Sequence, residues 1–277
     1  VGDGPLGARV HAVRAEEAAT QVQPLSGKGI VVTRPAHQAA HLAELIRAAG
    51  GRAILFPVIE IVEVGDLQPL LALIDRLDEF DLAIFISPNA VNKAMNLIKA
   101  RRALPTHLQL AAIGRSGVRE LRHFGITAVI APAARFDSEA LLELPALRDV
   151  AGKRIVIFRG DGGRELLGDT LTARGAAIEY AECYRRGRPQ LDATPLLKAW
   201  ARNEVHAITG SSSEGLRNLY DLVGKLGQSW LKKTPLFVPH PRIGQAAREL
   251  GLATVVLTAQ GDEGLVQGLE QWFAVHA

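Results

Sequence analysis

Polar side chains that could bind an anion recur at one kind of place along the chain, directly after a short apolar run. Arg34 follows the apolar residues 30–32, and Arg159 follows residues 155–157. Guanidinium groups bind carboxylates and phosphates, and so do the free backbone N–H groups at a helix start. The pattern therefore favours a ligand with several negative charges. The candidate binding residues are Arg34, Ser87, Asn89, Gly114, Ser116, Arg159, Arg164, Ser211, Ser212, His240 and Arg242.

Each of these residues also has an explanation that needs no ligand. Serine and asparagine before a helix commonly serve as N-caps, and a single arginine is commonly an exposed surface side chain. His240 lies between two prolines, where a functional role and a turn position are equally supported. The hypothesis of an anion site therefore depends on the collective pattern and not on any one member.

Tyr184 and Cys183 lie side by side in residues 178–188, which alternate as a half-buried strand does. A buried tyrosine hydroxyl needs a partner and can serve as an acid at a domain junction, although Tyr184 could equally pack between domains. Cys183 is the single cysteine, so an internal disulfide is excluded. Because no histidine is close to it in the sequence, we interpret Cys183 as a buried core residue rather than as a nucleophile.

Known signatures of metal and phosphate chemistry do not fit. His37 and His41 are four residues apart on one predicted helix, but no third ligand is near, so an exposed polar face is favoured and no metal site is predicted. Residues 160–165 lack the last glycine of the dinucleotide pattern, and the chain has no Walker lysine. Ser212 lacks the glycine of a nucleophile elbow, which argues against a covalent serine mechanism.

The sequence segments that position these residues occur twice along the chain. Each copy reads as a strand, a turn and a helix, which predicts an α/β fold of two similar domains with parallel sheets flanked by helices. Carboxyl ends of parallel strands meet at one edge, where ligands bind, so the candidates are expected to face one cleft. The paired segments are 27–51 with 152–176, 81–91 with 205–216, and 110–125 with 236–251.

Two divisions into domains are compatible with this repeat. A tandem division gives residues 26–150 and 151–277. A swapped division inserts a second domain into a discontinuous first one, through two connecting ribbons. Its first domain is 26–57 plus 187–277, its second is 63–180, and its ribbons are 58–62 and 181–186. Periodicity does not decide between them.

Composition limits the function classes. A chain of 277 residues with 48% apolar and 22% charged residues is typical of a soluble globular protein with two domains, and no apolar run could cross a bilayer. The net charge of +3, without a block of basic residues and with 5% aromatics, argues against a nucleic-acid platform. Residues 1–25 show no sustained apolar period and no signal-peptide pattern, so they are predicted to be a flexible tail.

Over about residues 27–273, the order of motifs resembles that of uroporphyrinogen-III synthases. The motifs are VVTRPAHQAAHLAELIRAAGG leading to FPVIEI, DLAIFISPNAV, AAIGRSGVRELRHFG, DSEALL, IVIFRGDGGRELLGDTLTARGA leading to AECYRR, AITGSSSEGL and VPHPRIGQAARELG. The resemblance implies two α/β domains joined by a two-stranded ladder, with the second domain inserted into the first. It therefore favours the swapped division.

The resemblance also implies a lyase of tetrapyrrole (haem) biosynthesis. Such an enzyme closes hydroxymethylbilane, a linear tetrapyrrole rich in carboxylates, to uroporphyrinogen III with inversion of ring D and loss of water, without a cofactor. We expect a cytoplasmic monomer that receives its substrate by transient handover from the preceding pathway enzyme. Neither nucleic acid nor a membrane is expected as a partner.

Residue by residue, the family's tyrosine in the second connecting strand falls on Tyr184, which the resemblance implies assists departure of the hydroxyl. The hydroxyl positions of the first half fall on Ser87 and Ser116. In the second half, Gly210 stands where a serine is frequent, and Arg242 or Ile243 where a threonine occurs. Ser211, Ser212 and backbone amides are the substitutes there.

Two alternatives belong to other classes. A non-catalytic two-domain binding module would close on an anionic small molecule by hinge motion at the ribbons. A nucleic-acid binder would show DNA affinity that falls steeply with salt.

Overall fold

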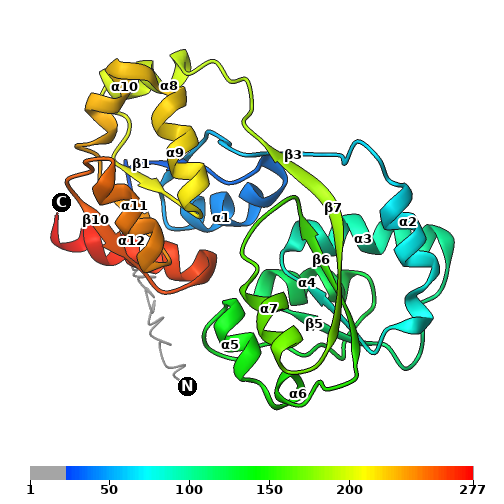
Figure 1. Cartoon of the computed structure of the whole chain (residues 1–277). Helices are drawn as coiled ribbons and strands as arrows, with labels where there is room; N and C mark the ends of the chain where they lie inside the picture. Colours follow the sequence, from blue (N-terminus) through cyan, green and yellow to red (C-terminus); the bar gives the residue numbers. More distant parts are fainter. Residues whose placement is uncertain (1–22, 277) are drawn as a thin grey trace, which may run out of the picture.

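Two five-stranded sheets organise residues 23–276, which the computed structural model describes (Figure 1). The first sheet has the order β10-β9-β8-β1-β2, with every neighbouring pair parallel. Its strands are β1 (Gly29–Val32), β2 (Arg52–Leu55), β8 (Ala207–Thr209), β9 (Leu236–Val238) and β10 (Val255–Leu257). Its helices are α1 (Ala36–Ala48), α8 (Thr194–Ala201), α9 (Ser213–Leu222), α10 (Gly224–Leu231), α11 (Pro241–Glu249) and α12 (Gly261–Val275). We call this unit domain 1.

Domain 2 contains the second sheet, of order β3-β7-β6-β4-β5, in which only the β3–β7 pair is antiparallel. Its strands are β3 (Glu60–Val62), β4 (Leu82–Phe85), β5 (Gln109–Ala112), β6 (Arg154–Gly160) and β7 (Ala177–Gly187). Its helices are α2 (Gln68–Asp75), the 3-10 helix η1 (Leu77–Glu79), α3 (Pro88–Arg101), α4 (Arg115–His123), α5 (Ser138–Glu143), α6 (Pro145–Arg148) and α7 (Leu166–Ala173).

Helices cover both faces of each sheet, which explains why the strands are almost continuously apolar. In β1, Ile30 and Val32 belong to the core under α1 and α12, whereas Val31 belongs to the core under α9 and α11. Domain 2 repeats this arrangement, with α2 to α4 on one face and α5 to α7 on the other. The predicted α/β class with two parallel sheets flanked by helices is confirmed.

The sequence repeat is also a repeat in space. The order β2-β1-β8-β9-β10 of domain 1 is matched in domain 2 by β7-β6-β4-β5, followed by an isolated bridge between Ala111 and Ile130. Residues 127–131 pair with β5 only at that single position, so they do not form a further parallel strand. The carboxyl ends of the parallel strands lie at one edge of each sheet, as expected.

The sheet order supports the swapped division, because β1 and β2 share a sheet with β8, β9 and β10. We propose that the domains divide as 26–57 plus 187–277 and 63–180. In the connecting ladder, Ile61 pairs with Arg186. Strand β7 is still paired in parallel with β6 as far as Tyr184, so the first part of the expected ribbon at 181–186 belongs to the sheet of domain 2.

The predicted tail at 1–25 falls mostly on residues 1–22, which lie outside the described residues. Its last residue, Leu25, is fully buried in the core of domain 1. The Leu25 N–H donates to the Ala49 carbonyl oxygen at 3.0 Å. The predicted tail therefore extends too far, because Leu25 belongs to the folded part of domain 1.

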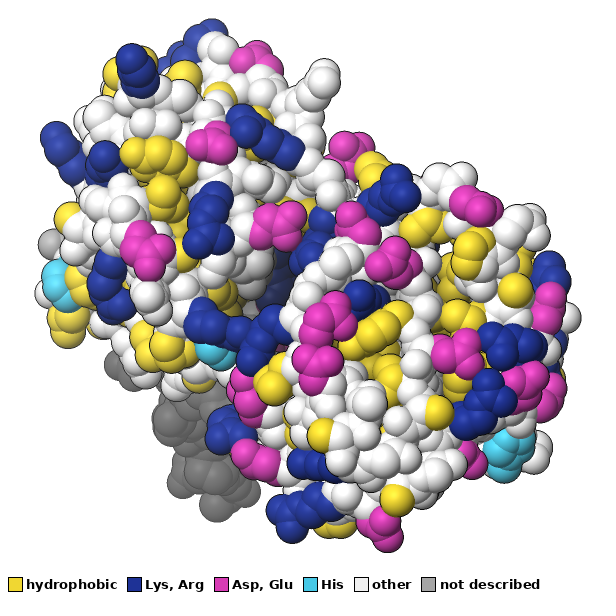
Figure 2. Space-filling view, viewed as in Figure 1, with side chains coloured by type: hydrophobic (Ala, Val, Ile, Leu, Met, Phe, Trp, Pro, Cys, Tyr) yellow, Lys and Arg dark blue, Asp and Glu magenta, His cyan; other side chains and the backbone are white. Residues whose placement is uncertain are grey.

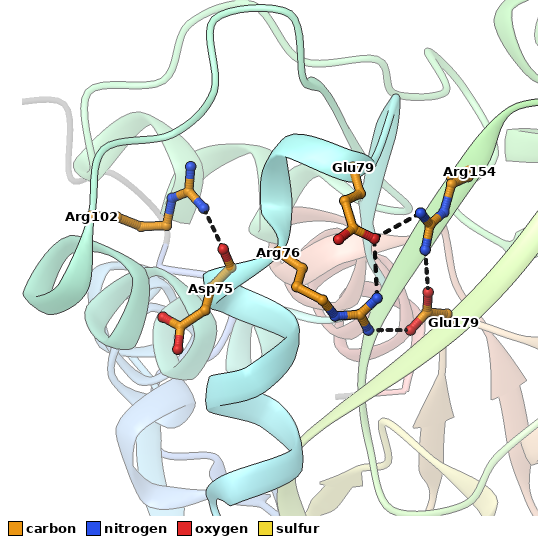
Figure 3. A network of polar contacts seen from close by, with 6 residues as sticks. All are labelled: Asp75, Arg76, Glu79, Arg102, Arg154 and Glu179. Atoms are coloured by element: carbon orange, nitrogen blue, oxygen red, sulfur yellow. Dashed lines mark hydrogen bonds and ion pairs between the residues drawn. The ribbon is translucent and has the colours of Figure 1, made fainter.

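An ion network closes the opposite edge of domain 2, where its parallel strands begin (Figure 3). Arg154, at the start of β6, donates to Glu79 at 2.7 Å and to Glu179 at 3.0 Å. Arg76 donates to the same two carboxylates, at 3.1 and 2.8 Å. The network ties α2 and η1 to β6 and β7. Its charges are satisfied by one another, so they do not form a ligand site.

Candidate functional site

A cavity of about 630 Å³ lies between the two domains, and we call it the interdomain cleft. Its walls come from α1 of domain 1, from the first turns of α3 and α4 of domain 2, and from Ile61 of the connecting strand β3. Figure 2 shows that Lys and Arg side chains gather along the groove between the two domains. Of the predicted binding residues, Arg34, Asn89 and Ser116 line this cleft.

The start of α3 fixes one wall of the cleft. Ser87 is the N-cap, and its Oγ accepts the N–H of Ala90 at 3.1 Å, while Pro88 fits the first helical position. Asn89 and Lys93 then lie one helical turn apart on the same face, and both line the cleft. A cation is therefore placed beside a buried amide.

Tyr184 lies behind this helix start. Its phenol oxygen is 2.8 Å from the Ser87 Oγ, and either hydroxyl can donate. The tyrosine is only 5% exposed, and burial raises the pKa of its phenol, against the effect of the Ser87 hydrogen bond. Tyr184 does not line the cleft, whereas Pro88, the residue after Ser87, does. Ser87 does not line the cleft either, so the Ser87–Tyr184 pair adjoins the cleft through Pro88.

The domain 1 wall carries an arginine and a histidine that share one carboxylate. Arg34 Nη1 lies 2.7 Å from Asp262 Oδ1, and His41 Nδ1 lies 2.9 Å from Asp262 Oδ2. Asp262, in the first turn of α12, is 5% exposed, and the Arg34 side chain is 18% exposed. Both Arg34 and His41 line the cleft. The wall is therefore lined by the Arg34 cation and the His41 ring, and the carboxylate that contacts both does not line it.

His37 joins the two walls. Its Nε2 is 2.5 Å from the Oδ1 of Asn89, so α1 of domain 1 contacts α3 of domain 2. His37 and His41 thus have separate partners, Asn89 and Asp262, rather than one exposed polar face in common. Within the described part of the chain, no cluster of three or more His, Cys, Asp or Glu side chains is suited to a metal ion.

Two predicted arginines are held by groups of domain 2 and do not line the cleft. Arg159, 8% exposed at the end of β6, pairs with Glu165 at 3.0 Å and lies 3.9 Å from the centroid of the Tyr180 ring. Burial and the neighbouring Glu165 raise the pKa of the Tyr180 phenol to about 12. Arg164 is an exposed side chain paired with Glu139 at 2.7 Å.

The predicted residues of domain 1 behave mainly as helix caps. Ser212 is the N-cap of α9, and the Nδ1 of His240, the N-cap of α11, accepts the Arg242 N–H at 3.2 Å. Burial and the nearby Arg242 lower the pKa of His240, which favours the neutral ring that can accept this bond. Ser211 and Arg242 are exposed, and none of these four residues lines the interdomain cleft.

A second cavity of about 730 Å³ adjoins α11 and α12 on one side and domain 2 on the other. Here the Phe136 N–H donates to Gln260 Oε1 at 2.8 Å, which makes another contact between the domains. Arg115 lines this cavity, and its guanidinium carbon lies 4.9 Å from the centroid of the Phe136 ring. Gly114 is the N-cap of α4 and provides no side-chain cap. The start of α4 lies between the two cavities, because Arg115 lines the second cavity and Ser116 lines the interdomain cleft.

Sequence reasoning missed three charged residues of the site: Lys93, Arg119 and Asp262. Lys93 and Arg119 were within reach of helical periodicity, because they lie one turn after Asn89 and Ser116, respectively. No local signal marks Asp262, whose partners Arg34 and His41 are at the other end of the chain. The buried Cys183 is confirmed as filler, and burial raises the pKa of its thiol to about 12.

The fold and the site together define a two-domain α/β protein that can enclose an anionic small molecule between its domains. Cationic groups from both walls face the cleft, and helix starts of both domains point their free N–H groups toward the carboxyl edges of the sheets. Comparison with known proteins identifies the family.

The family model described as uroporphyrinogen-III synthase HemD matches residues 40–267. The uroporphyrinogen-III synthase of Escherichia coli (strain K12) is 35% identical over 87% of this chain and 99% of its own length. That of Salmonella typhimurium (strain LT2) is 36% identical over the same shares of both chains. The chain therefore belongs to the uroporphyrinogen-III synthase family, which comprises hydro-lyases of tetrapyrrole biosynthesis.

Solved structures support the same fold. A mutant uroporphyrinogen III synthase from Thermus thermophilus superposes with a TM-score of 0.58, at 19% identity, over 88% of this chain and 98% of that one. The enzyme from Helicobacter pylori 26695 superposes with a TM-score of 0.54, at 13% identity, over 87% and 97%. None of the helices in residues 23–276 is both long enough and apolar enough to cross a membrane.

Proposed function

We propose that this chain closes hydroxymethylbilane to uroporphyrinogen III, with inversion of ring D and loss of water. The observation that carries the proposal is the interdomain cleft, which is lined by Arg34 of one wall and by Lys93 and Arg119 of the other, and which reaches Pro88 next to the Ser87–Tyr184 pair. Arg34, Lys93 and Arg119 would pair with carboxylates of the substrate, since charge-assisted hydrogen bonds are the strong ones in such sites. Asn89 and Ser116 would add neutral donors.

Ser87 would present the acidic proton. A serine hydroxyl has one donor and two acceptor positions. The Ser87 Oγ already accepts the Ala90 N–H, and in our proposal Tyr184 donates to its second acceptor position. The Ser87 O–H is then left to donate to the substrate hydroxyl. A tyrosine phenol is protonated at neutral pH even at its ordinary pKa, so Tyr184 has a proton to supply, although the burial that raises its pKa opposes release of that proton.

In this scheme the C–O bond breaks as the hydroxyl takes a proton from Ser87, which is replaced by the proton of Tyr184. Pyrrole nitrogens supply the electron pair that expels water, and the resulting cation is attacked by a ring-D carbon rather than by the free α position. A proton released when the rings regain aromaticity returns to the phenolate. Atoms and charges balance without an external oxidant or reductant, so the protein mainly orients the substrate.

Other predicted residues would bind the remaining carboxylates. Gly114 lies beside the start of α4, between the two cavities. The rest lie outside the interdomain cleft and stay predictions, to be tested by single variants in the same assay. They are Arg159, Arg164, Ser211, Ser212, His240 and Arg242.

We further infer a cytoplasmic monomer that takes its substrate by transient handover from the enzyme that makes it. The reason is that the linear tetrapyrrole closes spontaneously to the type I product, so less substrate is lost if it spends little time free in solution. Equilibrium sedimentation tests the monomer, and the effect of added trapping agents on coupled turnover tests the handover.

The experiment that tests the proposed function supplies freshly made hydroxymethylbilane to the purified chain, oxidises the products and separates the type I and type III isomers. Spontaneous closure gives only type I, so a reaction without protein is the control. We expect predominantly type III. Type I alone, from a folded sample, would contradict the proposal and favour the non-catalytic binding module.

A further inference from the structure

Asp262 is a buried carboxylate that the proposed mechanism does not use, although it contacts Arg34 and His41, which both line the interdomain cleft. We propose that Asp262 is a positioning residue for substrate binding, which holds Arg34 so that one edge of its guanidinium faces the cleft. The inference rests on the proposed function of the cleft. It assigns to Asp262 a role through Arg34, without contact with the substrate.

Helix capping does not explain the burial of Asp262. The residue lies in the first turn of α12, whose N-cap is Gln260 and which has no side-chain capping bond. A buried carboxylate is costly unless it is paired, although a helix N-terminus lowers that cost. The pairing here is with Arg34, in the loop between β1 and α1, and with His41 of α1. The carboxylate therefore serves these two groups rather than its own helix.

The Arg34 and His41 side chains lie between the Asp262 carboxylate and the cleft. Arg34 and His41 line the cleft, whereas Asp262 does not. Among residues 23–276, Asp262 is the only ion-pair partner of Arg34. A guanidinium is planar and has five N–H donors, so an arginine held along one edge can present the other edge to a second carboxylate. The Arg34 side chain, 18% exposed, retains that access.

The contact between Asp262 and Arg34 holds the guanidinium without using all of it. Asp262 Oδ1 lies 2.7 Å from Arg34 Nη1, yet this buried oxygen makes no hydrogen bond within the described residues. The pair is thus not a closed bidentate pair, in which two N–H groups would be used. His41 takes the other carboxylate oxygen at 2.9 Å, which leaves Asp262 no freedom to turn away.

The test replaces Asp262 by Asn, which keeps the shape and removes the charge. We expect D262N to raise KM for hydroxymethylbilane roughly tenfold while kcat changes by less than about twofold, because the lost interaction acts on binding. The R34Q variant should raise KM by a similar factor, and the double variant should be no worse than R34Q alone. D221N is the matched control, since Asp221 forms an exposed pair with Arg188 in the same domain.

A second readout does not depend on activity. Nitrogen-15 NMR of the Arg34 Nη groups should show restricted rotation in the parent chain and free rotation in D262N, whereas D221N should match the parent. An unchanged Arg34 signal in D262N would overturn the positioning role. Freed rotation with an unchanged KM would overturn the link to binding.

The two proposals fail in different ways. If the parent chain gave only type I product, the proposed function would fail, and the NMR measurement would still decide whether Asp262 orders Arg34. If D262N did not fold, D262E would replace it, because the charge is kept and only its position changes. For D262E we expect a KM between those of the parent and R34Q, and a KM equal to the parent's, with Arg34 rotation unchanged, would contradict the proposal.

Discussion

The two domains place a serine at equivalent helix starts, but they surround it differently. Ser87 caps α3 and accepts the Ala90 N–H at 3.1 Å, and Ser212 caps α9 and accepts the Gly215 N–H at 2.9 Å. Their backbone angles are nearly the same, at φ −156° and −154°. Only Ser87 has a phenol beside it, 2.8 Å away on Tyr184.

In domain 1, two buried apolar side chains lie near the start of α9. A Cβ added at Gly215 would lie 3.2 Å from Val58 and 3.5 Å from Ile59, which are both buried. The scaffold of cap and helix is thus shared by the repeat, whereas the candidate acid comes from β7, which continues to Gly187 where β2 ends at Leu55. The two domains therefore share the same helix start and serine cap. They differ because β7 extends from domain 2 into the connecting ladder and places Tyr184 beside Ser87 only.

The largest effect is expected from crowding Tyr184. A Cβ added at Gly160 would lie 2.5 Å from Cε2 of the Tyr184 ring, so G160A must displace the ring or the strand. Displacing a reacting group by about 1 Å costs on the order of a hundredfold in rate, and overpacking costs ~1–3 kcal/mol of stability. Steady-state kinetics and thermal unfolding measure both effects. G187A is the control, because its added Cβ would be 4.0 Å from the nearest atom. A G160A variant with the parent's kcat would show that the ring position does not matter.

Removing the two serine hydroxyls compares the two frames directly. S87A and S212A should each lose about 1 kcal/mol of stability, because each removes a helix cap. Only S87A should lower kcat, on the order of a hundredfold, since it also removes the hydroxyl that passes the proton of Tyr184 to the substrate. Urea unfolding and the isomer assay on both variants measure this. Equal losses of kcat would indicate that the domains contribute alike.

Acid should weaken domain 1 before domain 2. The Nδ1 of His206 accepts the Gly29 N–H at 2.9 Å, and burial, with Lys28 nearby, lowers the pKa of His206 below its ordinary value. The unfolded state therefore binds the proton more readily, so the free energy of unfolding falls as pH falls below about 6.5 and continues to fall until the folded-state pKa is passed. Amide exchange at Gly29 between pH 7.5 and 5.5 measures this effect.

The H206N variant keeps an acceptor that does not titrate, and it should lose this pH dependence. In domain 2, His123 is exposed and makes no bond to a backbone N–H within the described residues, so H123Q is the control. If Gly29 exchanged at the same rate in the parent and H206N at pH 5.5, His206 would not be the source.

The smallest effect is expected at the edge of domain 2 that is farthest from the cleft. E79Q should lower stability by less than about 1 kcal/mol, because Glu79 and its partners Arg76 and Arg154 are all roughly two-fifths exposed. The loss should shrink in 1 M NaCl, where exposed ion pairs are screened. R148A, which removes an exposed arginine with no ion-pair partner within residues 23–276, is the control for charge alone. A loss that did not depend on salt would indicate a packing role.

The sequence predicts the sheets and helix caps better than it predicts the side-chain contacts between distant segments. Repeated apolar runs ending in polar residues are enough to predict two parallel sheets, and the cap positions of Ser87 and Ser212 follow from local rules. Residues 127–131 are also mostly apolar, yet they do not form a strand, because they pair with β5 at only one position, Ile130.

What could not be predicted depends on pairs far apart in the chain. The contact of Arg34 with Asp262 joins segments 228 residues apart, and no pattern along the chain connects them. The hydrogen bond between Ser87 and Tyr184 is of the same kind, across 97 residues. For Arg159, its place after a strand suggested a ligand, whereas the structure gives it Glu165 and the Tyr180 ring. Whether a charged side chain faces a cleft or a neighbour is decided by tertiary packing.

The central claim is that Tyr184, acting through Ser87, supplies the proton when water leaves. The most direct test compares Y184F with Y180F, whose phenol lies four residues earlier on the same strand beside Glu165. Single-turnover rates of type III formation should fall on the order of a hundredfold in Y184F, the lower range for loss of a general acid, and should stay near the parent's in Y180F. A Y184F variant that forms type III product at the parent's rate would contradict the account.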